Sequence, residues 1–459
     1  MKIIVCGAGN VGFSIASYLE KYDNDIVVID QSEELVRRIS DRHDIQGICG
    51  YASDPSILTR AGAAEADLII AVTHHDEVNM VACEVAHALF NVPTKIARIR
   101  NQAYLDPQWV HLFDDFNLSI DVTISPEIEV ARSIGQSLSV PGVFRVSPLV
   151  DGLVNIIGVK CTLDTPIINT PITHITSIFP EAEMRVVAIN RPTHSFLPND
   201  KETLLPGDEV LFAVSHDKVV EALKAFGQYE TDKRRVIIVG AGNVGLSLAQ
   251  NLEDLLPDLD VRIIEKLKNR AREISKYLTD TLVLHGDALD SEVLEEAGVE
   301  NTDTIVAVTE DDKVNTLTSL LAKRSGAKRA VALVNNTASH PLVTSLGVDA
   351  IISPKEITVS SILEHVRRGH IRSIHILKQG FAEIFEGEIQ ENSSLTGASL
   401  LDIEIPGKVL LAAIVRDRTV LMPSANITLQ LNDRIVLVVA SESIIETEKL
   451  FSTRLEYFR

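Results

Sequence analysis

A short apolar run that leads into three closely spaced glycines occurs twice in this chain. Residues 2–12 read Lys-Ile-Ile-Val-Cys-Gly-Ala-Gly-Asn-Val-Gly, and residues 235–245 read Arg-Val-Ile-Ile-Val-Gly-Ala-Gly-Asn-Val-Gly. The pattern G-x-G-x-x-G after a strand is typical of a strand–turn–helix unit that holds the pyrophosphate of a dinucleotide. The first glycine allows a tight turn, the second lets a phosphate approach, and the third lets helix pack on strand. The helix N-terminus favours the anion, so two copies predict two nucleotide-binding units.

The repeat extends far beyond the glycines. Matching positions recur at nearly constant spacing: Asp30 with Glu265, Gly50 with Gly286, Ala71–Asn79 with Ala307–Asn315, Ile124 with Ile352, and Asp208 with Asp433. Such a period indicates tandem duplication of a complete module, with insertions in its loops.

Hydrophobic periodicity in the first half predicts a parallel sheet. Short apolar runs alternate with amphipathic stretches of helical period, which is typical of right-handed β-α-β units. The expected strands are Ile3–Cys6, Ile26–Asp30, Gln46–Cys49, Leu68–Val72, Lys95–Ile99 and Ile120–Ile124. The expected helices are Val11–Lys21, Glu33–Ser40, Pro55–Ala61, Glu77–Phe90 and Trp109–Phe116.

Residues 143–227 change to β-type alternation with several prolines, and a final helix is expected at Lys218–Phe226. The predicted fold class is therefore α/β, with two tandem Rossmann-type parallel-sheet domains, each followed by a small α+β domain. We expect domain boundaries at 1–140, 141–227, 233–370 and 371–459, with Gln228–Arg235 as the linker.

A long helix with an apolar stripe follows each predicted Rossmann sheet, at 126–139 and at 354–368. Such a helix can fold back on its own domain, or it can cross to a partner and form a self-complementary interface. We favour the crossing.

Composition and charge exclude several classes of function. The formal net charge of -21 argues against a broad nucleic-acid surface, which needs a basic face. The apolar runs are far shorter than the ~20 residues of a membrane-spanning helix, so a membrane role requires a partner. The four cysteines are not in C-x-x-C spacing, and we interpret them as reduced core residues of a cytosolic protein.

The stretch His74–Asn79 has a structural interpretation. His74 and His75 are adjacent on a turn, where two side chains rarely ligate one ion, so no metal site is predicted. Asp76 and Glu77 are interpreted as acids in the first turn of a helix, where they favour its dipole.

The first nucleotide site is predicted at Gly7–Val11. Asp30, which ends the second strand, can accept both hydrogen bonds of an adenosine ribose diol and would repel a 2′-phosphate. This favours NAD or an adenine nucleotide over NADP. Asp30 is alternatively a helix N-cap, because Glu33 follows three residues later. Thr73–His75 follows the fourth strand, where its backbone can approach phosphates. Arg98 either contacts a phosphate or pairs with a carboxylate across an interface.

The second site has the same glycine loop, with Glu265 as an acceptable ribose ligand. Leu333 stands where the first copy has Arg98, so a positive charge is missing. This site binds a different nucleotide, binds more weakly, or is structural, and the sequence leaves these alternatives open.

No catalytic pair is predicted beside either site. A dehydrogenase needs a proton donor or acceptor beside the nicotinamide and a shaped substrate pocket. The stretches 143–227 and 372–459 contain no His/Asp or Lys/Asp pair in a glycine-bounded loop, and they repeat as regulatory modules do. We therefore favour a ligand-gated regulatory subunit over an NAD-dependent oxidoreductase with duplicated Rossmann domains.

Over its whole length the chain resembles the TrkA family of Trk potassium-uptake regulatory proteins. The resemblance is carried by Met1–Ile4 with Gly7–Gly12 and Asp30, Ala71–Thr73 with Asp76–Cys83, Leu89–Pro93 with Ile96–Arg100, Gly240–Gly245, Gly286–Ala288, Leu321–Lys328, Ile352–Pro354 and Leu363–Arg367. It implies two RCK-N (KTN) nucleotide-binding domains and two RCK-C domains, in the order N1-C1-N2-C2.

The resemblance also implies a function. Such a protein is a cytoplasmic subunit, peripheral on the inner face of the cell membrane, that binds NAD(H) and responds to ATP and ADP. It forms a homo-oligomeric gating ring, expected to be a tetramer of chains, beneath a potassium channel subunit similar to TrkH or TrkG. Carried over by position, the cofactor-binding residues are Gly7, Ala8, Gly9, Asn10, Val11, Asp30, Tyr51, Thr73, His74 and Arg98 in the first site, and Gly240, Ala241, Gly242, Asn243, Val244, Glu265, Asp287, Thr309 and Glu310 in the second.

Overall fold

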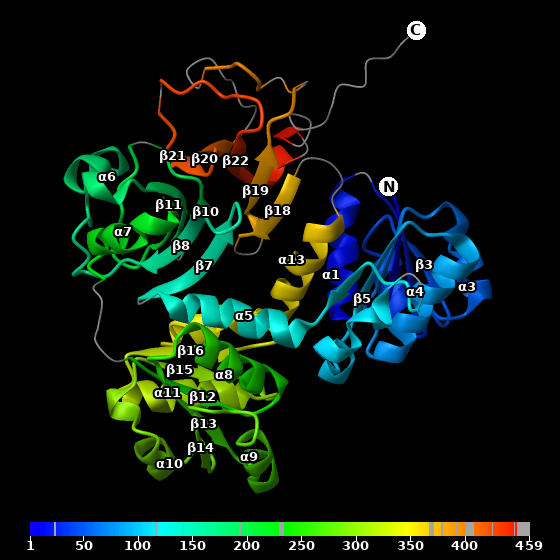
Figure 1. Ribbon diagram of the computed structural model, residues 1–459, viewed down its shortest axis with the longest axis horizontal. Helices are drawn as coiled ribbons and strands as arrows, with labels where there is room; N and C mark the ends of the chain where they lie inside the picture. The colour runs from blue at the N-terminus through cyan, green and yellow to red at the C-terminus, as the bar shows by residue number, and fades with distance from the viewer. Residues whose placement is uncertain are drawn as a thin grey trace. The chain divides into compact units, whose positions relative to one another are not determined.

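The computed structural model (Figure 1) describes residues 1–447 except 23, 115–116, 141, 192–193, 200, 229–233, 367–370, 378–379, 392, 394, 400–407, 425 and 445. The chain forms two compact units. Unit 1 consists of residues 1–132, 235–253 and 261–366, and unit 2 of residues 133–234, 254–260 and 367–459. Each half of the chain thus contributes to both units. The four predicted domain boundaries stay a prediction, and 229–233 of the predicted linker lie outside the described residues.

Unit 1 contains one six-stranded parallel sheet from each half of the chain. The first has the order β3-β2-β1-β4-β5-β6. Its strands are β1 (Lys2–Cys6), β2 (Asp25–Asp30), β3 (Gln46–Cys49), β4 (Leu68–Ala71), β5 (Thr94–Arg98) and β6 (Val122–Ile124). Its helices are α1 (Asn10–Leu19), α2 (Glu33–Ser40), α3 (Pro55–Arg60) and α4 (Asp76–Phe90), with the short 3-10 helices η3 (Gln102–Leu105) and η4 (Pro107–Phe113).

The second sheet repeats this topology in the order β14-β13-β12-β15-β16-β17. Its strands are β12 (Arg235–Val239), β13 (Asp260–Glu265), β14 (Leu282–His285), β15 (Thr304–Ala307), β16 (Arg329–Leu333) and β17 (Ala350–Ile352). Its helices are α8 (Asn243–Leu255), α9 (Lys268–Ile274), α10 (Ser291–Glu296), α11 (Asp312–Arg324) and α12 (His340–Ser345). Two Rossmann-type sheets are therefore confirmed.

The central strands are buried on both faces. Ile3–Cys6 in β1 and Ile69–Ala71 in β4 have no solvent exposure. Continuous runs of branched apolar residues are what a parallel sheet covered by helices requires, because neither face meets water. This burial fixes the strand ends from which the loops of both candidate sites begin.

A long helix follows each sheet, namely α5 (Pro126–Ser139) and α13 (Pro354–Val366). Helix α13 packs against helix α1 and strand β6, which both come from the first half of the chain. Figure 1 draws α13 beside α1. Helix α13 thus reaches the other half of the same chain. The favoured crossing to a partner in a self-complementary interface stays a prediction.

Unit 2 contains two five-stranded antiparallel sheets. The first, in the order β10-β9-β11-β8-β7, consists of β7 (Val143–Leu149), β8 (Val154–Lys160), β9 (Arg185–Asn190), β10 (Ser195–Phe196) and β11 (Glu209–Ser215), with helices α6 (Ile172–Ile178) and α7 (Val219–Ala225). The second, in the order β18-β19-β22-β20-β21, consists of β18 (Ile371–Ile376), β19 (Ala382–Glu388), β20 (Val409–Arg416), β21 (Thr419–Leu421) and β22 (Arg434–Ala440).

The two antiparallel sheets share one apolar core, to which Ile156 and Leu211 contribute from the first sheet and Ile384 and Val438 from the second. A buried carboxylate reinforces this contact. Glu386 accepts a hydrogen bond from the Val150 backbone N–H at 2.8 Å, and it pairs with Arg434. Because a buried charge is stable only when it is paired and hydrogen-bonded, this network fixes how the sheets of unit 2 face each other.

The helix expected at Trp109–Phe116 differs in its bounds. It overlaps the 3-10 helix η4, which begins at Pro107 and ends at Phe113, and residues 115–116 lie outside the described residues. Pro107 occupies the first turn, the Asp106 side chain accepts the Gln108 N–H, and the backbone of Trp109 departs from helical angles. A proline start and an Asx turn favour a short, tight helix over an α-helix.

Candidate nucleotide-binding sites

Both glycine loops lie where the strand order of their sheet reverses. The reversal falls between β1 and β4 in the first sheet, and between β12 and β15 in the second. Loops that follow two such strands diverge to opposite faces and leave a crevice at the carboxyl ends of the strands, where ligands bind in open α/β sheets. The sequence therefore brings its glycine loops to the expected edge.

The three glycines of the first loop meet different surroundings. Gly7 has a φ of +109°, a backbone conformation that side chains disfavour, and a Cβ at Gly12 would lie 1.8 Å from the carbonyl oxygen of Gly7. A Cβ at Gly9 would meet nothing closer than His74 Nε2, at 3.9 Å. Gly7 and Gly12 are thus required by the turn and by helix packing, whereas Gly9 leaves free space above the loop.

The second loop has the same geometry. Gly240 has a φ of +99°, and a Cβ at Gly245 would lie 2.0 Å from the Gly240 carbonyl oxygen. No atom lies within 4 Å of a Cβ built on Gly242. Each loop therefore offers an open backbone surface at its middle glycine, which is where a phosphate needs close approach.

The predicted ribose carboxylates lie directly beside the glycine loops. Asp30 accepts the Ala8 N–H at 2.6 Å and the Ser32 N–H at 2.8 Å. The N-cap of α2 is Ser32, whose hydroxyl accepts from Leu35 N, so the interpretation of Asp30 as that cap is wrong. Each oxygen of a carboxylate can accept a second hydrogen bond. The half-buried Asp30 therefore retains acceptor capacity for a diol.

Glu265 repeats this arrangement in the second copy. It accepts the Ala241 N–H at 2.8 Å and the Leu267 N–H at 2.7 Å. Glu265 is buried, with 8% exposure. The longer side chain reaches the same two backbone groups as the aspartate of the first copy.

A buried asparagine that the sequence analysis missed links the loop after β4 to the end of β5. Asn79 Oδ1 accepts the Thr73 N–H at 2.9 Å and the Thr73 hydroxyl at 2.7 Å. Asn79 Nδ2 donates to the carbonyl oxygen of Thr73 at 3.3 Å and to that of Arg98 at 2.9 Å. The only sequence signal was the recurrence of Asn79 as Asn315 within the repeat.

Asp76 also does more than the sequence predicts. It begins α4, as a dipole-favouring acid would, but its Oδ2 accepts the N–H groups of Arg100 and Asn101 at 2.9 and 2.8 Å. The carboxylate therefore fixes the loop that follows β5. Asp312 accepts the N–H groups of Asn335 and Asn336 in the second copy.

Arg98 is half-buried at the carboxyl end of β5, and its Nε is buried without a hydrogen-bond partner among the described residues. Burial lowers the pKa of Arg98, and the charge of Arg100 adds to this, while Glu127 and Asp76 act in the opposite direction. In the described part of the chain the ion pair with Glu127 is made by Arg100, at 3.0 Å. Both alternatives for Arg98, a phosphate contact and an interface ion pair, stay predictions.

The second site differs in charge. Leu333 is buried at the position of Arg98, with 5% exposure. Asp287, at the position of Tyr51, forms an ion pair with Lys266 at 2.7 Å, and this contact lowers the pKa of the Asp287 carboxyl. The carboxylate of Asp287 is thus engaged, and the basic group of the first site is replaced by an apolar one.

The remaining predicted residues lie around the two openings. Ala8 and Ala241 are buried in their loops, whereas Asn10 and Asn243 are exposed where α1 and α8 begin; Val11 and Val244 are half-buried. Thr73 and Thr309 are half-buried, and Tyr51, His74 and Glu310 are exposed. Together the loops can hold phosphates by backbone N–H groups and a diol by a carboxylate.

The described residues contain no group of three or more His, Cys, Asp or Glu side chains arranged to hold a metal ion. Within the same residues, no helix has both the length and the apolar character needed to cross a bilayer.

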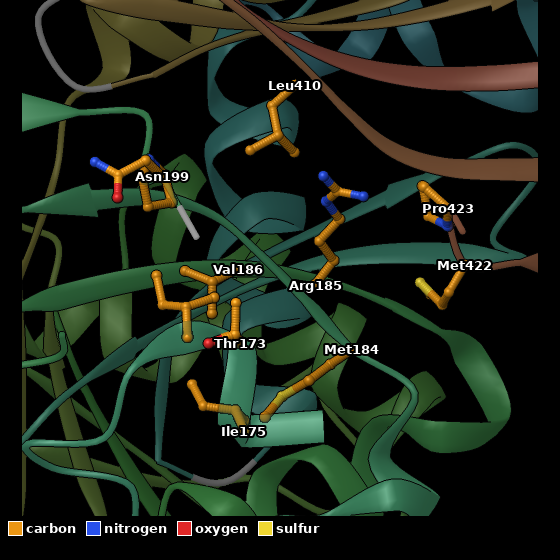
Figure 2. A pocket seen from close by; sticks show the side chains of 11 residues that line it. Thr173, Ile175, Met184, Arg185, Val186, Asn199, Leu410, Met422 and Pro423 are labelled. Atoms are coloured by element: carbon orange, nitrogen blue, oxygen red, sulfur yellow. The ribbon is translucent and has the colours of Figure 1, made fainter. Parts of the chain in front are cut away.

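Unit 2 has a cavity of about 330 Å³. Its lining side chains come from the segments of both antiparallel sheets, among them Thr173, Arg185, Leu410 and Met422 (Figure 2).

Family models match three stretches of the chain, and curated relatives match its whole length. The TrkA-N domain family matches residues 3–126 and again 236–354, and the TrkA-C domain family matches residues 384–452. The chain is 43% identical to the Trk system potassium uptake protein TrkA of Azorhizobium caulinodans, with 100% of both chains covered. It is 38% identical to the protein of the same name from Halomonas elongata, again over 100% of both.

Solved structures share the fold at low identity. The GsuK channel superposes with a TM-score of 0.61 at 17% identity, over 98% of this chain and 78% of that one. The GsuK channel bound to NAD gives a TM-score of 0.60 with the same identity and coverage. The GsuK RCK domain gives 0.59 at 17% identity, over 98% of this chain and 94% of that one.

Proposed function

The chain belongs to the TrkA family of Trk-system potassium uptake proteins, and from this premise we propose that it is the nucleotide-sensing, gating-ring subunit of such a system. It binds NAD(H), with ATP and ADP as further ligands, and controls a membrane channel subunit similar to TrkH or TrkG. It acts in the cytoplasm, on the inner face of the membrane, as a ring of four chains. The relatives are potassium uptake proteins, so an oxidoreductase is not favoured.

One observation carries the nucleotide-sensing role. In both halves a glycine loop with an open middle glycine lies at the strand-order reversal, and a carboxylate is hydrogen-bonded to the loop itself. The loop supplies N–H groups for a pyrophosphate, and Asp30 or Glu265 supplies acceptors for the ribose diol. The fold shared with the NAD-bound GsuK channel supports NAD(H) as the ligand.

The two sites have unequal roles in this mechanism. The first has the cation Arg98 at the phosphate side, so it holds the more highly charged ligands, while the second has Leu333 and binds more weakly. Occupancy changes the angle between the paired Rossmann units, and a ring transmits that change to the channel. A ligand shifts this equilibrium only by its differential affinity for the two ring states.

Calorimetric titration of the full chain with NADH, NAD, ATP and ADP tests the assignment. Asp30→Ala is expected to weaken binding to the first site by about 10-fold or more, since hydrogen bonds to a charged acceptor contribute about 1.5–3 kcal/mol each. Glu265→Ala is the matched control, which leaves the first site intact. The decisive contradiction is an Asp30→Ala protein that no longer binds nucleotide but still shows nucleotide-dependent potassium flux with the membrane subunit.

Cysteine labelling provides an independent prediction. Cys49 ends β3 beside the first site and is exposed, so its interpretation as a core residue is wrong. Its Sγ lies 3.5 Å from the Gln31 carbonyl oxygen. Cys6 is buried, and burial raises the pKa of its thiol to about 12, which keeps it protonated and unreactive. Alkylation of the native chain is therefore expected first at Cys49, and NADH should slow it, because the ribose edge of the ligand covers this strand end.

Mass-spectrometric rates of Cys49 alkylation measure this protection. The Asp30→Ala protein is the control and should lose the protection while its unliganded rate stays the same. Equal Cys49 rates with and without saturating NADH would show that the ligand does not lie over β3.

A further inference from the structure

Each site contains one asparagine whose side-chain amide makes hydrogen bonds at all of its donor and acceptor positions. Asn79 has no solvent exposure, and its four hydrogen bonds join Thr73 to the backbone carbonyl of Arg98. A carboxamide offers two acceptor positions and two donor hydrogens, so this set satisfies it completely. A single buried side chain therefore sets the spacing between the loop after β4 and the last residue of β5.

In the second copy Asn315 makes the same hydrogen bonds as Asn79, but Leu333 takes the place of Arg98. Asn315 accepts from Thr309 N and Oγ1 at 2.8 and 2.6 Å, and donates to the carbonyl oxygens of Thr309 and Leu333 at 2.9 Å each. Asn315 is likewise fully buried. The two sites thus share the asparagine contact, and they differ in whether the residue it holds carries a charge.

We propose that Asn79 is a positioning residue that sets the reach of Arg98 toward the nucleotide phosphates, and thereby the preference of the first site for ligands with more phosphate charge. This inference rests on the proposed function. Asn79 itself touches no ligand in this arrangement. It holds the backbone from which the Arg98 side chain extends, while the opposite end of the same amide holds Thr73 beside the glycine loop.

The position of the Arg98 side chain affects how well it can bind an anion, because part of its guanidinium is buried. Its Nε is buried and has no partner among the described residues, and a desolvated guanidinium gains most from an anion placed to meet its fixed fork of N–H groups. A small displacement of the backbone at Arg98 changes that fit. The Ile99 N–H is bonded to the Ile124 carbonyl at 2.9 Å on the other side of the strand, so Asn79 supplies the fixed contact on the side of the site.

In the second site the same contact cannot affect phosphate selectivity, because Leu333 has no charge to position. Asn315 therefore serves as a matched control. Replacing it should weaken every nucleotide at that site in equal proportion, as the loss of a purely structural contact does.

The experiment measures the ratio of the ADP and ATP dissociation constants by calorimetry on the full chain. To isolate the first site, all its variants are made in a Gly242→Ala background, in which the new methyl finds no atom within 4 Å and faces the phosphate position of the second loop. Asn79→Ser and Arg98→Leu are prepared singly and together. A double-mutant cycle then separates coupling from additive effects.

We expect Arg98→Leu to reduce the preference for ATP by about 10-fold, the size of one charge-assisted contact. Asn79→Ser should shift the ratio in the same direction. In the double variant the Asn79 change should then alter the ratio no further. Should Asn79→Ser fail to fold, Asn79→Asp keeps the shape and the acceptor toward Thr73 but cannot donate to Arg98, and the same shift is expected.

For comparison, Asn315→Ser in a Gly9→Ala background should leave the ADP-to-ATP ratio of the second site unchanged. If Asn79→Ser weakens ADP and ATP equally, or if its effect adds to that of Arg98→Leu, the positioning role is overturned while nucleotide binding stands. If the Gly242→Ala parent binds neither ADP nor ATP, the proposed function of the first site fails, and the inference fails with it.

Discussion

Replacing Gly12 with alanine is expected to destabilise the first Rossmann unit by more than about 3 kcal/mol, the upper end of ordinary overpacking. The new Cβ would lie 1.8 Å from the Gly7 carbonyl oxygen and 2.9 Å from the Gly7 carbonyl carbon. Both atoms belong to a backbone that is held by the hydrogen bond from Gly7 N to the Ile29 carbonyl, at 2.7 Å. No side-chain rotation relieves the clash, so α1 must separate from β1.

Gly9→Ala is the matched variant in the same loop. A Cβ at Gly9 finds no atom closer than 3.9 Å, and the φ of −65° at this position suits alanine. We expect Gly9→Ala to retain the melting temperature of the parent and to lose affinity for NADH, because the methyl occupies the space where a phosphate approaches the loop.

Chemical denaturation and NADH calorimetry on the two variants distinguish a structural glycine from a binding one. Gly245→Ala, with its clash of 2.0 Å, should behave like Gly12→Ala. A Gly12→Ala protein with parental stability would refute the packing argument. A Gly9→Ala protein with parental affinity would place the phosphate elsewhere.

The second large effect is expected in unit 2, where Asp433→Ala should reduce the free energy of unfolding by about 3–5 kcal/mol. Asp433 is 1% exposed and accepts from Arg416 Nε and Nη2 at 2.8 and 2.7 Å, and from the Gln430 N–H at 2.8 Å. The hydrogen bond to Asp433 raises the pKa of Arg416. Removing the carboxylate leaves a guanidinium and a turn N–H without their partner.

The repeat provides a second buried aspartate on which the same prediction can be tested. Asp208 holds Arg191 and the Leu205 N–H in the first module in the same way, so Asp208→Ala should have an effect of similar size. The exposed pair of Glu442 with Lys408 is the control, and Glu442→Gln should leave denaturant midpoints unchanged, as expected for a solvated ion pair. A loss below about 1 kcal/mol in either buried variant would contradict the argument.

Local signals in the sequence were sufficient to predict much of unit 1. The bounds of α2 and β3 agree with the prediction. Helix α2 begins at Glu33 because Ser32 is its N-cap and Glu33 is an acid in its first turn. The duplicated glycine pattern fixed the two loops, and the strand order of the Rossmann sheet brought each loop to the reversal point. These features depend on residues that are close in sequence, or on a topology rule.

Contacts between distant residues could not be predicted in this way. An asparagine at position 79 has the same sequence signature whether it faces solvent or joins Thr73 to Arg98. The apolar stripe of α13 shows that one face is buried, but not that α1 of the same chain covers it. Likewise, the sequence contains both Lys266 and Asp287, but only the fold shows that they form an ion pair.

The contact of α13 with α1 and β6 has a consequence for how such a regulator responds to its own abundance. Because the two Rossmann halves belong to one chain, they are held together whatever the number of copies in the cell. Dilution or low expression therefore cannot separate the two proposed nucleotide sites. The covalent link also fixes the ratio of the two halves at one to one. Arg98 in the first half and Leu333 in the second therefore occur together in every copy of the chain.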